Sequence, residues 1–105
     1  MFEKIELEAG YIKFHQVIDF ADIHYIKVFP DFRGQGYGTK LMNAFLEEMK
    51  DRGVKDVTLE VRVDNLIAIK LYEKFGFKAV GFRKKYYEGS TDGLLMKLDL
   101  IDIKN

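Results

Sequence analysis

A chain of 105 residues with 48% hydrophobic residues is long enough to form one packed core, so we expect a single domain over residues 1–105. Lysine plus arginine and aspartate plus glutamate balance at 17 each, which argues against a nucleic-acid partner held by a basic field. The chain has no cysteine, which excludes disulfides, thiol nucleophiles and cysteine-based zinc sites. No apolar run approaches the length of a membrane span, and the charged start Met1-Phe2-Glu3-Lys4 is unlike a signal peptide, so we expect a cytoplasmic protein without a membrane partner.

Three segments at the start of the chain, residues 2–8, 11–18 and 23–29, alternate apolar and polar side chains as strands do. Ala9-Gly10 and residues 19–22 separate them as turns, which predicts an antiparallel meander. His15 and His24 fall on different predicted strands, far apart in sequence. Isolated histidines of this kind are more often surface or packing residues than ligands, so we predict no metal site.

A glycine-rich loop follows the third predicted strand. Glycines at positions 34, 36 and 38 allow backbone to approach a ligand closely, and Arg33 adds a positive charge. The helix predicted over residues 40–52 points its free N–H groups and positive dipole end into this loop. Such an arrangement is typical of phosphate binding, so we interpret the loop as a pyrophosphate site.

The spacing of the loop narrows the choice of phosphate-binding motif. Thr39 rather than lysine follows Gly38, which does not fit a P-loop. Thr39 also stands where the dinucleotide motif G-x-G-x-x-G needs its third glycine. The pattern that fits is Arg-x-x-Gly-x-Gly, formed by Arg33, Gly36 and Gly38.

The second half of the chain alternates strands and helices. The helix over residues 40–52 has an apolar face and ends before Gly53. A strand is predicted over residues 54–63, and a short helix over 66–75 that Asn65 caps and Gly76 ends. Two final strands are predicted over residues 77–87 and 94–103. The order β-β-β-α-β-α-β-β predicts a mixed α/β sheet with a β-α-β crossover at its centre.

Several motifs together resemble those of the GNAT acetyltransferase superfamily. The Arg-x-x-Gly-x-Gly loop between a strand and a helix resembles its acyl-CoA loop. The run LEVRVDN at residues 59–65, with AI at 68–69 and LYEKFGF at 71–77, is similar to its L-E-V-R-x-x-N…A-I-x-L-Y-E-x-x-G-F run. The segments RKKYY at 83–87 and DGLLM at 92–96 resemble the tail of its protein N-terminal acetyltransferases, the branch that contains the ribosomal-protein-alanine enzymes.

This resemblance implies an acetyl-CoA-dependent N-acetyltransferase that acts on a primary amine, most simply the α-amine of a protein or peptide. It implies that Glu60 is the general base, that Tyr72 is the general acid near the sulfur, and that Asn65 contacts the cofactor beside the thioester. Tyr86 and Tyr87 are its candidate substrate-binding residues, of which at most one faces the cleft on an alternating strand. The implied cofactor-binding residues are the backbone of Ile26, Lys27 and Val28 for the pantetheine arm, and Arg33, Gly34, Gln35, Gly36, Tyr37, Gly38 and Thr39 for the pyrophosphate.

The chemistry of these residue types agrees with that role. Transfer of an acetyl group to an amine requires a neutral amine, a polarised thioester and a proton for the departing thiolate. A tyrosine phenol with a pKa of about 10 can protonate a thiolate with a pKa of about 8.5. Because the chain lacks cysteine, direct attack by the amine is favoured over a covalent thioester on the enzyme.

Structural interpretations of the same residues stay open at this point. In these structural interpretations, Glu60 is an ion-pair partner of Arg62 or Lys70, Tyr72 is a core residue and Asn65 is a helix cap. Two other functions also remain: a non-catalytic CoA-binding or interaction module, and a Rossmann-type nucleotide binder in which Glu60 contacts a ribose. A small-molecule amine is the alternative acceptor.

The chain departs from the family pattern near its start. The family inserts two helices between its first and second strands, where Gly10 leaves room only for a turn. We therefore expect Ile12, Phe14 and Val17 to lack cover on at least one face of the sheet. A second copy would provide that cover, which predicts a homodimer with its interface in residues 1–25.

Overall fold

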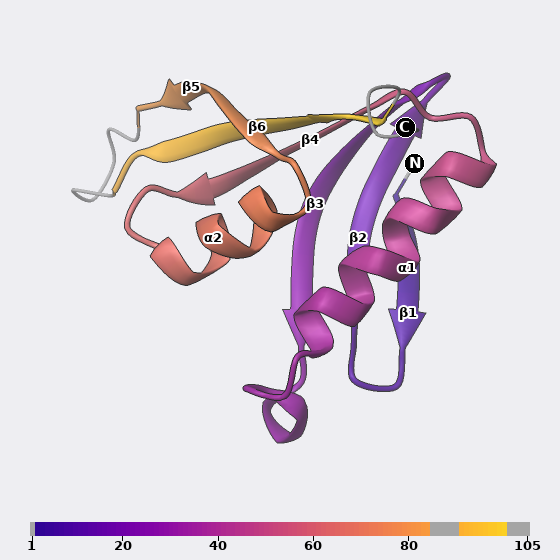
Figure 1. Cartoon of the computed structure of the whole chain (residues 1–105), viewed down its shortest axis with the longest axis vertical. Helices are drawn as coiled ribbons and strands as arrows, with labels where there is room; N and C mark the ends of the chain where they lie inside the picture. Colours follow the sequence, from indigo (N-terminus) through magenta and orange to yellow (C-terminus); the bar gives the residue numbers. More distant parts are fainter. Residues whose placement is uncertain (1, 85–90, 101–105) are drawn as a thin grey trace.

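The structure is a computed structural model that describes residues 2–84 and 91–100. The predicted order of strands and helices is confirmed, with a short 3₁₀ turn, η1 (Pro30–Phe32), before the first helix (Figure 1). The elements are β1 (Glu3–Leu7), β2 (Gly10–Val17), β3 (Phe20–Val28), α1 (Tyr37–Asp51), β4 (Asp56–Arg62), α2 (Leu66–Lys74), β5 (Lys78–Arg83) and β6 (Gly93–Asp99).

The predicted starts of one helix and one strand are wrong. Helix α1 begins at Tyr37 rather than at residue 40, because Gly36 takes a left-handed φ of 83° as its N-cap and Gly38 lies inside the first turn. Strand β3 begins at Phe20 rather than at residue 23. The turn before it is short and contains Ile18 at a positive φ of 55°, an uncommon conformation for a β-branched residue.

The strands form one mixed sheet in the order β1-β2-β3-β4-β6-β5. Strands β1, β2 and β3 pair antiparallel as the predicted meander, and the pair β3–β4 is parallel. Helix α1 connects these two parallel strands, which confirms the central β-α-β crossover. One parallel pair beside an antiparallel meander is not a doubly wound parallel sheet, so the Rossmann alternative is wrong.

Strands β3 and β4 are joined along a short stretch and then separate. Their pairing covers Phe20–Asp22 and Asp56–Thr58. A β-bulge lies where the separation begins, because Lys13 faces Tyr25 while the next residue, Phe14, faces Ile23, which leaves His24 as an extra residue on β3. Such a bulge bends its strand and increases the local twist. Figure 1 shows the resulting divergence of the two strands, with α1 and α2 on the same side of the sheet.

The core lies between the sheet and the two helices. Five residues of α1 are buried in it, and Phe14 packs edge-on against Phe45 with ring centroids 5.1 Å apart. The expectation that Ile12 and Phe14 lack cover is wrong: both are 0% exposed, because α1 crosses their face of the sheet. Val17 alternates with them along β2, and this side chain is 54% exposed.

Neither of the described helices combines the length and the apolar character needed to cross a membrane.

Candidate functional site

The glycine loop ends in an uncapped helix terminus. Gly34 and Gly36 have φ angles of 75° and 83°, in the left-handed region that L side chains rarely adopt. Among the described residues, no side chain caps the start of α1, and its first turn holds no acidic residue. The free N–H groups and the positive dipole end of α1 therefore point into the loop, and the first turn of the helix holds no carboxylate of its own, an arrangement that favours binding of a phosphate.

Side chains of the loop hold it against the end of β3. The Nε of Arg33 donates to the carbonyl oxygen of Val28 over 2.9 Å. The amide of Gln35 donates to the carbonyl oxygen of Asp31 over 3.1 Å. These two predicted pyrophosphate residues thus have structural tasks: Arg33 ties the loop to the end of the strand that would carry the pantetheine arm, and Gln35 ties it to the turn η1.

The end of β3 offers one of its backbone edges to the cleft. Ile26, Lys27 and Val28 pair with β2 on one side, whereas the pairing with β4 on the other side covers only the start of β3. Gly10 lets β2 approach closely, since a Cβ there would overlap the carbonyl oxygen of Lys27. An extended ligand arm can add to such an edge as an extra strand would. This geometry fits the predicted pantetheine-binding residues.

The three residues assigned to the chemistry come together where β3 and β4 separate. One pocket of about 220 Å³ is lined by Glu60 of β4, by Asn65 just before α2 and by Tyr72 of α2. Ile26 of β3 lies on its other wall. Asn65 also caps α2, because its Oδ1 accepts a hydrogen bond from the N–H of Ala68 over 3.2 Å. The structural interpretation of Asn65 is therefore confirmed, and its place beside the pocket is compatible with a second role.

Tyr72 is largely enclosed by the core that supports it. Its ring packs edge-on against Phe77, with centroids 6.0 Å apart, so the packing interpretation is confirmed too. Burial raises the pKa of the Tyr72 phenol above its ordinary value. The hydroxyl therefore stays protonated at neutral pH and is available as a proton donor.

Glu60 has an ion-pair partner that the sequence interpretation did not name. The Nε of Arg83 on β5 donates to Oε1 of Glu60 over 2.8 Å. Arg62, one of the two partners considered from the sequence, pairs with Asp64 at 3.0 Å instead. Gly93 of β6 lies between the two strands that carry this pair, and a Cβ at that position would overlap the Glu60 carboxylate.

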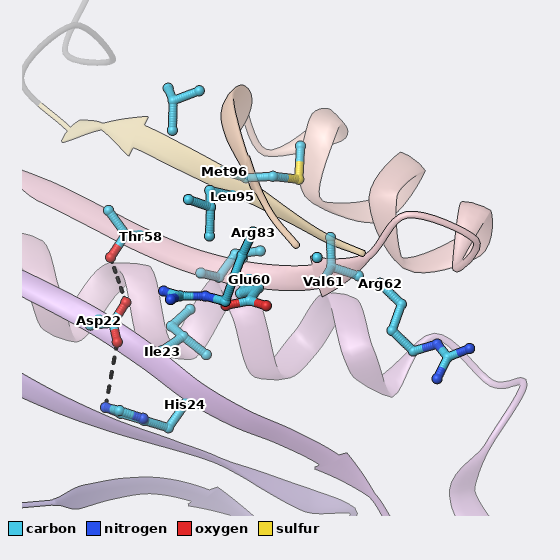
Figure 2. Close-up of a pocket in the computed structure, with 13 residues that line it drawn as sticks. Asp22, Ile23, His24, Thr58, Glu60, Val61, Arg62, Arg83, Leu95 and Met96 are labelled. Atoms are coloured by element: carbon cyan, nitrogen blue, oxygen red, sulfur yellow. Dashed lines mark hydrogen bonds and ion pairs between the residues drawn. The ribbon is translucent and has the colours of Figure 1, made fainter. Parts of the chain in front are cut away.

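A larger pocket of about 660 Å³ adjoins the pair formed by Glu60 and Arg83 (Figure 2). Its walls come from β3, β4, β5 and β6, and they include Asp22 and His24. The sequence analysis gives Arg83 no role in the site, and it does not predict that His24 lies beside the cleft. Tyr86 and Tyr87, the candidate substrate-binding residues, lie outside the described residues.

Comparisons with known proteins agree with this geometry. The sequence matches the family described as Acetyltransferase (GNAT) family over residues 8–77. It is 39% identical over 87 residues to the [ribosomal protein bS18]-alanine N-acetyltransferase of Escherichia coli K12, covering 80% of this chain and 59% of that protein. It is 40% identical over 67 residues to N-alpha-acetyltransferase 30 of Schizosaccharomyces pombe, covering 64% of this chain and 45% of the relative.

The structural comparison gives the same relatives. The crystal structure of the ribosomal-protein-S18-alanine N-acetyltransferase from Escherichia coli superposes with a TM-score of 0.83 at 37% identity, over 88% of this chain and 61% of that one. The chain thus spans about three fifths of the length of the curated relatives it matches first. The family match covers most of the chain, including the glycine loop, β4 and α2. This chain therefore belongs to the acetyltransferase (GNAT) family.

Proposed function

We propose that this protein is an acetyl-CoA-dependent N-acetyltransferase and that its acceptor is the N-terminal α-amine of a protein or peptide. The observation that carries the proposal is that Glu60, Asn65 and Tyr72 line one pocket between β3 and β4, beside an open strand edge. The acceptor class follows the relatives: one is named as a [ribosomal protein bS18]-alanine N-acetyltransferase and another as an N-alpha-acetyltransferase.

Acetyl-CoA is the acyl donor of this family, and when bound it supplies the thioester whose acetyl group is transferred. The edge of β3 from Ile26 to Val28 would hold the pantetheine arm by backbone hydrogen bonds. The positive-φ glycines and the start of α1 would hold the pyrophosphate, because this backbone is open and carries no negative charge.

Glu60 and Tyr72 divide the proton transfers between them. The amine nitrogen forms a bond to the acetyl carbonyl carbon, and the bond from that carbon to sulfur breaks. Glu60 accepts the proton that the amine loses, directly or through one water molecule, and Tyr72 donates a proton to the departing sulfur. A protein α-amine has a pKa of about 8, against about 10.4 for lysine, so a carboxylate base deprotonates the former more readily.

A thiol-release assay with acetyl-CoA tests the proposal. The acceptors are a panel of peptides that differ in their first residue, with free lysine, a polyamine and an aminoglycoside alongside. We expect release with peptides, and its loss when the peptide N-terminus is blocked. Release with the small amines alone would show that the acceptor is a small-molecule amine and not the N-terminus of a protein or peptide. A thermal shift with CoA but no release with any amine would support the non-catalytic CoA-binding module instead.

Two finer expectations stay proposals. Cytoplasmic localisation fits an enzyme whose named relatives act on a ribosomal protein. A homodimer through residues 1–25 no longer has Ile12 and Phe14 as support, but Val17 and Ile18 in that segment are 54% and 86% exposed. Light scattering of the purified chain distinguishes the dimer mass from the monomer mass, and Val17→Lys should shift a dimer toward monomer.

A further inference from the structure

The hairpin formed by β2 and β3 brings three possible metal ligands together. His15 lies directly across from Asp22 in the strand register, and His24 follows on the same strand as Asp22. One ligand atom from each of these side chains lies within 4.8 Å of the other two. The prediction that the two histidines are isolated is therefore wrong.

The distances inside this cluster are close to those of a zinc site. The Nδ1 of His15 lies 2.8 Å from the Nε2 of His24, and that Nε2 lies 3.4 Å from Oδ2 of Asp22. A tetrahedral zinc ion with nitrogen ligands at about 2.05 Å separates two ligand atoms by about 3.3 Å. The two measured separations lie within about 0.5 Å of this value.

Neighbouring side chains orient the ligands. The hydroxyl of Thr58 on β4 donates to Oδ1 of Asp22 over 2.5 Å, while the other carboxylate oxygen, Oδ2, approaches His24 (Figure 2). The ring of Phe2 packs edge-on against both imidazoles, with centroids 4.6 Å from His24 and 5.9 Å from His15. Hydrogen-bonded carboxylates and packed imidazoles of this kind are the supports that metal ligands have in known sites.

We propose that His15, Asp22 and His24 form a binding site for a divalent transition-metal ion, with Zn²⁺ as the expected occupant. Two imidazoles and one carboxylate suit Zn²⁺, Ni²⁺ and Cu²⁺, whereas Mg²⁺ and Ca²⁺ prefer oxygen ligands. Asp22 and His24 also line the pocket that contains Glu60. The ion would thus sit at the edge of the cleft, on the bulged part of β3, and would fix the strand where it separates from β4.

The site is tested with ZnCl₂ on the chain purified without a polyhistidine tag and stripped of metal by a chelator. Isothermal titration should show saturable binding of one Zn²⁺ per chain, and the melting temperature should rise with Zn²⁺ concentration but not with Mg²⁺. His24→Ala should weaken Zn²⁺ binding by at least about 100-fold, because it removes a ligand rather than a supporting residue. Asp19→Asn, in the turn of the same hairpin and outside the cluster, is the matched control and should bind as the unmodified chain does.

A second variant covers the case in which His24→Ala does not fold. Thr58→Val keeps the size of the side chain and all three ligands but removes the hydrogen bond to Asp22, so Zn²⁺ binding should weaken by about 10- to 100-fold. Circular dichroism checks that each variant is folded. Absence of Zn²⁺ binding to the unmodified chain, or unchanged binding in folded His24→Ala or Thr58→Val, would overturn the proposal.

Discussion

Arg83 reaches Glu60 across the strand that lies between them, and the two side chains meet at 2.8 Å. Strand β6 separates β4 from β5, and at the crossing point it has Gly93, which pairs with Arg62 on one side and Arg83 on the other. A residue with a side chain at this position would occupy the space of the Glu60 carboxylate. The orientation of the proposed base therefore depends on a glycine far from it in sequence.

This relationship predicts the effect of Gly93→Ala. The new methyl group should displace the Glu60 carboxylate, and a misplacement of about 1 Å can lower turnover by about 10²-fold. The matched control is Gly81→Ala on β5, where a Cβ would meet Leu95 at 3.7 Å, an ordinary contact distance. We expect kcat to fall in the first variant and to stay near its original value in the second. Equal kcat values for the two variants would show that the carboxylate need not be held in this orientation.

Glu60→Gln tests the assignment of the base directly. The variant keeps the size of the side chain but cannot accept the proton, so turnover should fall by about 10²- to 10⁴-fold at neutral pH. The loss should shrink as the pH rises past about 8, where the α-amine is already neutral in solution. Asp64→Asn is the control, since this carboxylate belongs to the neighbouring ion pair with Arg62. If turnover falls by the same factor at every pH, Glu60 holds neighbouring groups in place and does not act as the base.

Tyr72→Phe separates the hydroxyl from the packing of the ring. The ring contact with Phe77 is retained, so the fold should survive, whereas the proposed proton donor to the departing sulfur is lost and turnover should fall by about 10²- to 10⁴-fold. The rise in melting temperature that CoA produces should be nearly the same in Tyr72→Phe as in the unmodified chain. Turnover equal to that of the unmodified chain would leave Tyr72 with its packing role alone.

The raised pKa of Tyr72 also predicts a change in stability at alkaline pH. Burial makes the folded state hold this proton more tightly than the unfolded state does. The stabilising effect of the neutral buried form is therefore fully present below the unfolded pKa of about 10, and it is lost as the pH rises toward the higher folded pKa. Chemical denaturation between pH 9 and pH 11 should show a shallower loss of unfolding free energy in Tyr72→Phe than in the unmodified chain. If the unfolding free energy falls equally steeply with pH in both proteins, burial does not raise the pKa of Tyr72.

Local sequence patterns were sufficient for the elements but not for the contacts between them. Alternation identified the strands, and the caps Asn65 and Gly53 marked helix ends. The pair of Glu60 with Arg83 depends on β6 lying between β4 and β5, which no local pattern encodes. The meeting of His15 with His24 was missed because the turn was placed at residues 19–22. With a turn centred on Ile18 and Asp19, residue 15 pairs with residue 22, and the bulge then brings His24 beside them.

Gly36 lies in the loop that we propose to hold the pyrophosphate of the cofactor, and it is the N-cap of α1. A side chain at its φ of 83° is strained, although no atom of the described residues, its two chain neighbours aside, lies within 4 Å of the position that a Cβ would take. Gly36→Ala should therefore destabilise the fold by about 1–2 kcal/mol, the usual penalty of the left-handed region, and it should also weaken CoA binding, because it alters the backbone at the start of α1. The matched control is Gly53→Ala, at a φ of 78° and equally free of neighbours, but just beyond the other end of α1. Both variants should lose similar stability in chemical denaturation, while only Gly36→Ala should reduce the thermal shift produced by CoA. A similar reduction in both variants would mean that general stability, rather than the geometry of the loop, controls the binding of CoA.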